Sequence, residues 1–293
     1  SGSSRVFSTY LGGVNQDQAL AIEVDGERRI VLGGFTRSSN FPTQNPYQPS
    51  LAGSTASDAF AARLSSSGSS LEFSTFIGGS LNDQANGLAV DATGNVYLGG
   101  YAVSANFPTR NAFQSSRAGS TYDAFVTALN SSGSQLIYSS YLGGSDSDIG
   151  YSFALDCLGR AYLAGHTASP DFPLVQPYQS SRSGTGTDAF VAQISSSGTS
   201  LLYSTYLGGA GSDSGYAIAC DSSDGFYLSG RTASSDFPTL CAYQASSAGG
   251  YDAFVAHMAG PALIFSTFLG GSAGDEGKGV AAGATDCYIA GQT

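Results

Sequence analysis

Lysine is almost absent from this chain of 293 residues: Lys278 is the only one, and the formal net charge at pH 7 is −11. A protein without a basic patch cannot neutralise a row of phosphates, so nucleic acid is excluded as an expected partner. The same acidity argues against anionic membrane surfaces. No apolar run approaches 18 residues, so we expect no membrane insertion.

The four cysteines form no Cys-x-x-Cys pair and stand at unrelated positions, which argues against a zinc site. Disulfides and buried thiols both remain open. Charged residues make up only 11% of the chain, and Ser, Thr and 40 Gly replace them. This composition is typical of extracellular proteins, so we expect an extracellular or cell-surface location.

What the chain does contain is repetition. A phrase of the type Phe/Tyr-Ser-Thr-Tyr-Leu-Gly-Gly recurs five times at intervals of 62 to 66 residues, at 7–13, 73–79, 138–144, 203–209 and 265–271. A second phrase, Asp-Ala-Phe, recurs only four times, at 58–60, 123–125, 188–190 and 252–254. Self-similarity at a steady period predicts one supersecondary unit that is repeated and stacked on its neighbours.

Each period consists of short strand-like runs. They are aromatic and β-branched, and Gly- and Asp-containing turns separate them, as in hairpins. No segment keeps a 3.6-residue apolar period, so little helix is expected. We predict one blade from strands near Asp58–Leu64, Leu71–Ile77, Leu88–Asp91 and Val96–Gly100. Several runs are apolar on both faces, which predicts sheets covered on both sides.

One connection in each period is long, for example that between Gly34 and Asp58. A propeller blade needs such a link where the chain crosses to the inner edge of the next sheet. This predicts Asp-Ala-Phe as the innermost strand and Tyr-Leu-Gly-Gly as the outermost. Recurring Phe-Pro and Tyr/Phe-Gln phrases predict an ordered crossover that an aromatic residue pins onto the blades.

The predicted fold is therefore all-β: a five-bladed β-propeller with four complete four-stranded blades plus one three-stranded N-terminal blade. It spans 1–293 as a single domain of about 65-residue repeats. The N-terminal blade lacks an Asp-Ala-Phe strand, which leaves an open edge. We expect a strand from a neighbouring subunit, or from a part of the protein outside this sequence, to pair with it.

The phrases Tyr203-Ser-Thr-Tyr-Leu-Gly-Gly209, Asp236-Phe-Pro-Thr239 and Asp188-Ala-Phe-Val191 resemble the SBBP-type β-propeller repeat of bacterial secreted and cell-surface proteins. The resemblance covers essentially the whole chain, with four phrases in the same order. It implies an extracytoplasmic propeller module without a common set of catalytic residues. The fifth unit departs from the pattern, because Gly283 stands where the other units have Asp.

An Asp stands four residues after each Gly-Gly pair. Carboxylate oxygens suit calcium, and together with Asp146 these residues are candidate calcium ligands: Asp17, Asp83, Asp146, Asp148, Asp213 and Asp275. The alternative is that each carboxylate caps N–H groups of its own loop. No cofactor other than calcium is expected.

The other repeated Asp residues are equivalent to one another, whereas acid–base catalysis needs unlike carboxylates at one place. They belong to the Asp-Ala-Phe phrases and to the turns at positions 25, 91, 156 and 221. We expect them to act in the fold. The four Glu and two His residues break the repeat, yet no nucleophile-elbow motif accompanies them. The sequence therefore predicts no catalytic residue.

The favoured function is a non-enzymatic structural or adhesive propeller module of a bacterial surface or filament assembly. Its expected partners are other protein subunits or cell-surface components. One alternative is a multivalent carbohydrate-binding propeller with glycans as ligands, and another is a glycosidase or lyase. The fold cannot choose among them, because function depends on sites placed on the fold.

Overall fold

The computed structural model of the chain describes residues 7–119, 121–283 and 286–293. Every regular element in these residues is a β-strand, which confirms the all-β class. The described part of the chain has no helix long and apolar enough to cross a bilayer. The chain divides into two compact units, one of residues 1–117 with 124–141 and one of residues 118–123 with 142–293.

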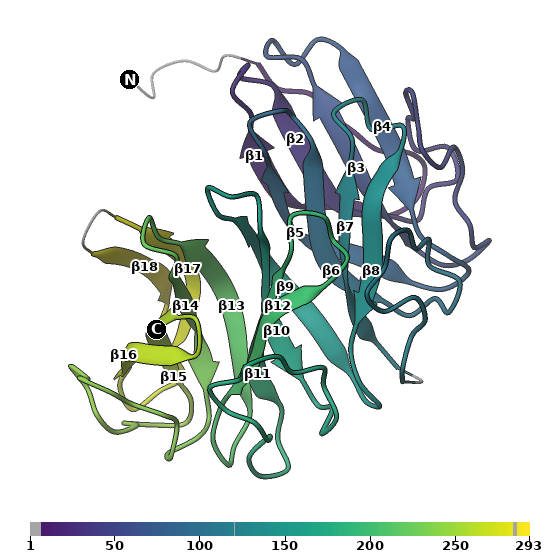
Figure 1. Ribbon diagram of the computed structural model, residues 1–293. Helices are drawn as coiled ribbons and strands as arrows, with labels where there is room; N and C mark the ends of the chain where they lie inside the picture. The colour runs from purple at the N-terminus through teal and green to yellow at the C-terminus, as the bar shows by residue number, and fades with distance from the viewer. Residues whose placement is uncertain (1–6, 120, 284–285) are drawn as a thin grey trace. The chain divides into compact units, whose positions relative to one another are not determined.

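The first unit contains two four-stranded sheets, and the strands of each lie in chain order. Figure 1 shows the first sheet in purple and blue, and the second follows it in blue and teal. The strands are β1 (Asp17–Val24), β2 (Ile30–Thr36), β3 (Asp58–Leu64), β4 (Leu71–Ile77), β5 (Asp83–Val90), β6 (Val96–Ala102), β7 (Asp123–Leu129) and β8 (Leu136–Leu142).

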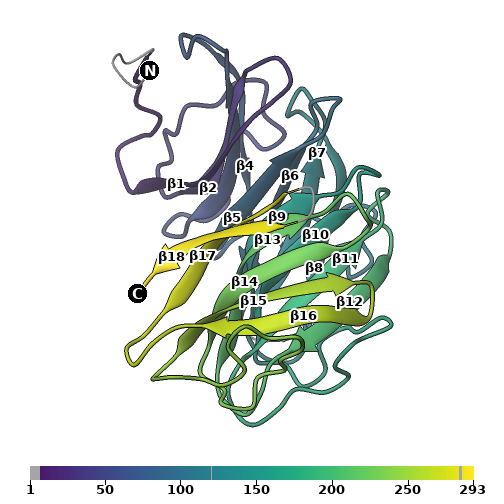
Figure 2. The same ribbon diagram turned by 90° about the vertical axis from the view of Figure 1, so that its left-hand side faces the viewer.

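The second unit contains two further four-stranded sheets and a two-stranded hairpin. Figure 2 shows the hairpin, in yellow, beside β13 and β14. The strands are β9 (Asp148–Leu155), β10 (Ala161–Thr167), β11 (Asp188–Ile194), β12 (Leu201–Leu207), β13 (Asp213–Cys220), β14 (Phe226–Thr232), β15 (Asp252–Ala259), β16 (Ala262–Leu269), β17 (Glu276–Ala282) and β18 (Cys287–Gln292).

Within each unit, the first strand of one sheet packs on the sheet before it. β5 lies against β1, β2 and β3, β13 lies against β9, β10 and β11, and β17 lies against β13, β14 and β15. Leu88 of β5 sits over Gly33 of β2, where an added Cβ atom would come 3.2 Å from the Leu88 side chain. The third strands β3, β7 and β11 are buried at every residue. This confirms the prediction of sheets covered on both faces.

The predicted strands exist, but their grouping into one blade is wrong. β3 and β4 complete the sheet that begins with β1, whereas Leu88–Asp91 and Val96–Gly100 fall on β5 and β6 of the next sheet. The Asp-Ala-Phe strand is therefore third in its sheet and not innermost. The prediction assumed that the longest link crosses between sheets, but the short segment 78–82 makes that crossing.

The long link covers the outer edge of its own sheet. Between β2 and β3, the Gln44 N–H donates to the Ser74 carbonyl over 3.1 Å, and Ser74 N–H donates back to Gln44 over 2.8 Å. The Phe76 N–H donates to the Gln48 carbonyl over 3.2 Å. Equivalent bridges join Arg110 to Ser139, Val175 to Ser204, Gln179 to Tyr206 and Leu240 to Ser266. Since an unpaired edge invites pairing with another chain, these links protect the fourth strands.

The Phe of each Phe-Pro phrase pins the link onto its sheet, as predicted. Its ring packs on the Phe ring of the Asp-Ala-Phe strand, with centroid distances of 4.7, 4.6, 4.6 and 4.5 Å for Phe41–Phe60, Phe107–Phe125, Phe172–Phe190 and Phe237–Phe254. The aromatic residue of the following Tyr-Gln phrase is not required for this contact, since Tyr243 is 90% exposed.

The prediction of a three-stranded N-terminal blade is also wrong. The sheet nearest the N-terminus has four strands, and the described residues of the first phrase, Phe7–Gly13, form no strand. In the four-stranded sheets the other copies of this phrase form the fourth strand, beside the Asp-Ala-Phe strand. The sheet with fewer strands in the described chain is instead the β17–β18 hairpin.

We expect Phe237→Ala to lower the free energy of unfolding by about 3–5 kcal/mol, because it empties a buried ring site between the link and β15. Urea unfolding of the full chain measures the change. Tyr243→Ala in the same link is the matched control and should shift stability by less than about 0.5 kcal/mol. Equal effects of the two substitutions would show that the Phe-Pro ring does not hold the link.

Candidate functional site

The Asp at the start of each first strand caps the Gly-Gly pair before it. Asp83 Oδ2 accepts the Gly79 N–H over 2.7 Å and the Ser104 hydroxyl over 2.7 Å. The same amide bond recurs at 2.7, 2.8, 2.9 and 2.8 Å for Asp17, Asp148, Asp213 and Asp275. Five of the six calcium candidates therefore have the geometry of the capping alternative.

The sixth candidate, Asp146, is exposed and accepts the N–H of its neighbour Ser147 over 2.8 Å. Residues 7–119, 121–283 and 286–293 contain no group of three or more His, Cys, Asp or Glu side chains placed to hold a metal ion. The six candidates therefore do not converge on one site. Calcium binding stays a prediction.

A second carboxylate lies beside each cap, from the Asp-Ala-Phe strand. A Cβ atom added to Gly208 would come within 2.7 Å of both Asp188 Cγ and Asp213 Oδ2. Gly143 stands in the same way between Asp123 and Asp148, and Gly270 between Asp252 and Asp275. Only glycine leaves room for two carboxyl groups at these points. The Asp of the Asp-Ala-Phe phrase and the Asp after the Gly-Gly pair belong to different phrases of the sequence, yet they lie side by side in the structure.

These paired carboxyls are buried and belong to the framework. Asp188 Oδ2 accepts the Ser183 N–H over 3.1 Å and the Gln179 side-chain amide over 3.0 Å. The side-chain oxygen of Gln179, Oε1, in turn accepts the Gly208 N–H over 3.0 Å. Both Asp188 and Asp213 have no exposed surface. They hold the link, the third strand and the Gly-Gly pair together, beyond the reach of a substrate.

Burial is the main reason why these carboxyls favour the neutral form. It raises the pKa of Asp58, Asp148 and Asp188 to about 7 and that of Asp83 to about 6. The neighbouring carboxylate adds to the effect, as Asp213 does for Asp188. Hydrogen bonds from the loops oppose the shift without cancelling it.

A carboxyl whose pKa is raised on folding stabilises the protein fully below its unfolded pKa and loses that contribution as the pH rises through the folded pKa. We therefore expect the melting temperature to fall between pH 5 and pH 8, by about 2–4 °C for each kcal/mol lost. Asp188→Asn should flatten this slope, because the amide cannot ionise. Asp146→Asn removes an exposed charge and should leave the slope unchanged. A melting temperature that rises from pH 5 to pH 8 would contradict the assignment.

The Asp at each hairpin turn between the first and second strands caps the turn. Asp91 Oδ1 accepts the N–H of Thr93 over 2.8 Å and of Asn95 over 2.9 Å. Asp25, Asp156 and Asp221 do the same at their turns. This agrees with the expected structural role. Burial opposes ionisation of Asp91, but the bonds from Thr93 and Asn95 lower its pKa overall.

The fourth residue after the turn Asp reaches back to its Oδ2 atom. Arg29 does so at 2.7 Å and Asn95 at 2.9 Å. In the fourth turn this residue is Gly225, which has no side chain, and His257 Nε2 takes the place at 2.7 Å from Asp221 Oδ2. His257 thus has a structural role that its sequence position does not reveal.

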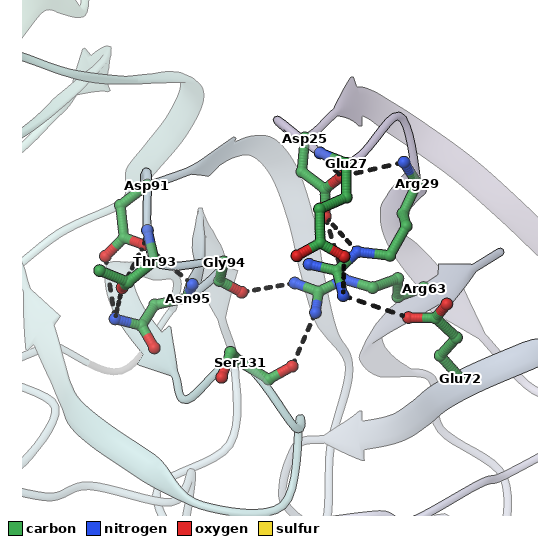
Figure 3. Close-up of polar contacts among 10 residues, drawn as sticks. All are labelled: Asp25, Glu27, Arg29, Arg63, Glu72, Asp91, Thr93, Gly94, Asn95 and Ser131. Atoms are coloured by element: carbon green, nitrogen blue, oxygen red, sulfur yellow. Dashed lines mark hydrogen bonds and ion pairs between the residues drawn. The ribbon is translucent and has the colours of Figure 1, made fainter. Parts of the chain in front are cut away.

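A denser cluster surrounds Arg63 in the first unit (Figure 3). The Arg63 side chain is buried, and its guanidinium donates to the carbonyls of Ser131, over 2.7 Å, and of Gly94. It also lies 3.7 Å from Asp25 Oδ2 and 5.1 Å from the Phe73 ring centroid. Burial and the nearby Arg29 charge lower the pKa of Arg63.

Two of the four glutamates join this cluster. Arg29 lies 3.2 Å from Glu27 and 3.6 Å from Glu72. A cavity of about 300 Å³ opens between the Asp25–Arg29 and Asp91–Gly94 turns. Arg29 pairs with Asp25 and Glu27, and Asp91 is held by N–H groups of its own turn, so the charged groups that line the cavity already have partners. The Arg63 bonds to Gly94 and Ser131 join β3 to hairpin turns of the adjacent sheet. The sequence does contain a signal for Arg63, because it is a charged residue within an otherwise apolar strand.

Arg63→Ala should lower the free energy of unfolding by about 3 kcal/mol or more, because it strips buried carbonyl oxygens of their donor and Asp25 of a cation. Chemical denaturation monitors the loss. Arg110→Ala removes an exposed cation from the same unit and should change stability by less than about 0.5 kcal/mol. An Arg63→Ala protein as stable as the Arg110→Ala protein would refute the role of the cluster.

Comparison with known families matches three segments of the chain, residues 72–108, 137–173 and 202–238, to SBBP, described as a beta-propeller repeat. Each segment begins in the fourth strand of one sheet and ends at the Phe-Pro phrase after the second strand of the next. No curated protein matches the chain. Three segments of the chain, with the strands, caps and links described above, are therefore copies of the SBBP beta-propeller repeat.

Proposed function

We propose that the protein is a non-enzymatic structural or adhesive module outside a bacterial cell, built from five propeller blades that close onto a second copy and not onto themselves. It would join other protein subunits through the faces of its sheets. The Ser-, Thr- and Gly-rich composition with a single lysine supports the extracellular location. The pairing of Glu27, Glu72 and Glu276 with Arg or Lys side chains supports a non-enzymatic role.

One observation carries the proposal: within the first unit, β1 presents an apolar face of the kind that other first strands bury. Ile22 is 64% exposed, whereas Leu88 and Ile218 at the equivalent positions of β5 and β13 are 5% and 6% exposed. Leu20 and Val24 extend the open face along the strand. Such a patch marks an interaction site in a soluble protein.

The covered copies indicate the kind of partner. Leu88 packs over Gly33 in the second strand of the preceding sheet, and Ile218 shares a core with Tyr162 and Ala164 of β10. A sheet of the same repeat type therefore fits the β1 face. We propose that the β17–β18 hairpin of a second copy supplies it, since Tyr288 on that hairpin is 66% exposed. This head-to-tail contact is heterologous and can extend into a filament.

Multivalent sugar binding through equivalent pockets has less support. It requires the same residues at the same positions of each blade. The first strands instead carry Leu20, Asn86, Tyr151, Tyr216 and Lys278 at one equivalent position.

The test is the concentration dependence of mass, measured by light scattering after size exclusion. We expect the wild-type chain to form oligomers whose mass rises with concentration, and Ile22→Lys to remain a monomer. Leu158→Lys changes a side chain that is equally exposed, at 65%, in a hairpin turn, and should associate like the wild type. A monomeric wild type, or an Ile22→Lys protein that still associates, would refute the proposed contact.

A further inference from the structure

Each first strand contains a β-bulge at the same place, and the bulged residue is of four different types among the five repeats. The register with the second strand slips there, between Gly215 and Ala217 in β13 for example. The extra residues are Leu20, Asn86, Tyr151, Tyr216 and Lys278. Bulges aim a side chain away from the ladder and are common beside functional sites. The strand pairing around the bulge is the same in each repeat, while the bulge residue varies. This variation indicates a role of the bulge residue beyond folding.

In the second unit these residues join side chains from the second strands into one continuous strip. We call this the bulge strip; it consists of Tyr151, His166, Tyr216, Arg231, Glu276 and Lys278. The Tyr151 ring lies 5.3 Å from His166 and 5.2 Å from Tyr216 in edge-to-face contacts. The Tyr151 hydroxyl is 3.2 Å from His166 Nδ1. At this end, the bulge strip therefore consists of packed aromatic rings that carry a hydroxyl group or a ring nitrogen at their edges.

Its other end is cationic. The Arg231 guanidinium lies between two rings, 5.8 Å from the centroid of Tyr216 and 5.2 Å from that of Tyr251. Lys278 Nζ lies 4.2 Å from the Tyr216 centroid. Glu276 pairs with both cations, at 3.0 Å from Arg231. The rings and the carboxylate hold the two cations in position, which reduces the entropy lost on binding a ligand.

The strip carries a net positive charge in an acidic protein. One carboxylate, that of Glu276, faces two cations, and His166 is neutral because burial and the Arg231 charge lower its pKa to about 4. The side chains of Arg231 and Lys278 remain 37% and 50% exposed. Lys278 is the only lysine of a chain with a net charge of −11. Two neighbouring cations on an otherwise acidic surface attract an anionic ligand that can approach them closely.

We propose that the bulge strip binds an acidic polysaccharide, with a uronate carboxylate on Lys278 and Arg231. A charge-assisted bond to the cations would fix the carboxylate, and the tyrosine edges would contact the sugar ring. A separate cavity of about 380 Å³ shares Glu276 with the strip and is also lined by Gln292 and Asp275, but not by Lys278 or Arg231. The side-chain oxygens of Glu276, Gln292 and Asp275 can accept sugar hydroxyls. The strip excludes the β1 face, but Glu276 and Lys278 lie on β17 of the hairpin that the proposed self-association uses, so binding is measured on the Ile22→Lys monomer as well as on the wild type.

Calorimetric titration of the full chain with tetragalacturonate tests the site, and the fully methyl-esterified tetramer is the matched ligand without charge. We expect the ester to bind about tenfold more weakly or not at all, since it loses the charge-assisted bond. Lys278→Gln should raise the Kd for the acid by about tenfold, and Lys278→Arg should restore most of the affinity. Arg110→Gln removes an exposed cation elsewhere and should bind like the wild type.

Each contrary result would overturn the proposal. These are no detectable binding of the acid, equal affinity for acid and ester, or equal loss in Lys278→Gln and Arg110→Gln. Binding of inorganic phosphate as tight as that of the tetramer would show that the sugar ring is not recognised. A thermal melt of each variant separates lost binding from lost folding, because Lys278 is half exposed and a folded Lys278→Gln protein still melts cooperatively.

Discussion

The buried carboxylate that accepts the amide of the Gly-Gly pair is the interaction on which the architecture depends. It lies where the chain leaves a fourth strand and enters the first strand of the next sheet, a passage of a few residues such as 78–82. Buried backbone N–H groups need partners, and here the Asp satisfies the Gly79 N–H while a Ser hydroxyl holds the Asp. The tight passage sets the spacing between sheets and brings the Asp-Ala-Phe carboxylate close. Burial at this passage is the main cause of the raised pKa values, and the neighbouring carboxylate adds to it for Asp188.

Strand positions could be predicted from the sequence, whereas their grouping could not. Aromatic and β-branched runs mark β3 and β4 because burial selects those residues locally. Which sheet a strand joins depends on long-range pairing, such as the Gln44–Ser74 bridges, and no local pattern encodes it. The sequence therefore suggests that the long link between the second and third strands crosses to the next sheet. In the structure, this link runs to the fourth strand of its own sheet and returns.

The same distinction holds for the site residues. The period identifies Asp83 and its equivalents as important, and the capping alternative describes their contacts. It does not show that Asp188 and Asp213 meet across a glycine, or that His257 replaces a missing side chain at Gly225. Both depend on contacts between elements distant in sequence. The bulge residues of the first strands vary in chemistry among the repeats, while the frame around them stays the same. Function on such a frame is expected at the positions that differ.

The family segments are offset from the sheets, since each runs from a fourth strand through the next two strands to a Phe-Pro phrase. Every segment therefore carries one complete junction between sheets, with its Gly-Gly pair and its Asp. If a gene gained or lost one such period, the number of sheets would change, but every junction would keep both of its halves. Recombination between repeats could then vary the length of these proteins and shuffle their bulge residues without having to invent a new contact.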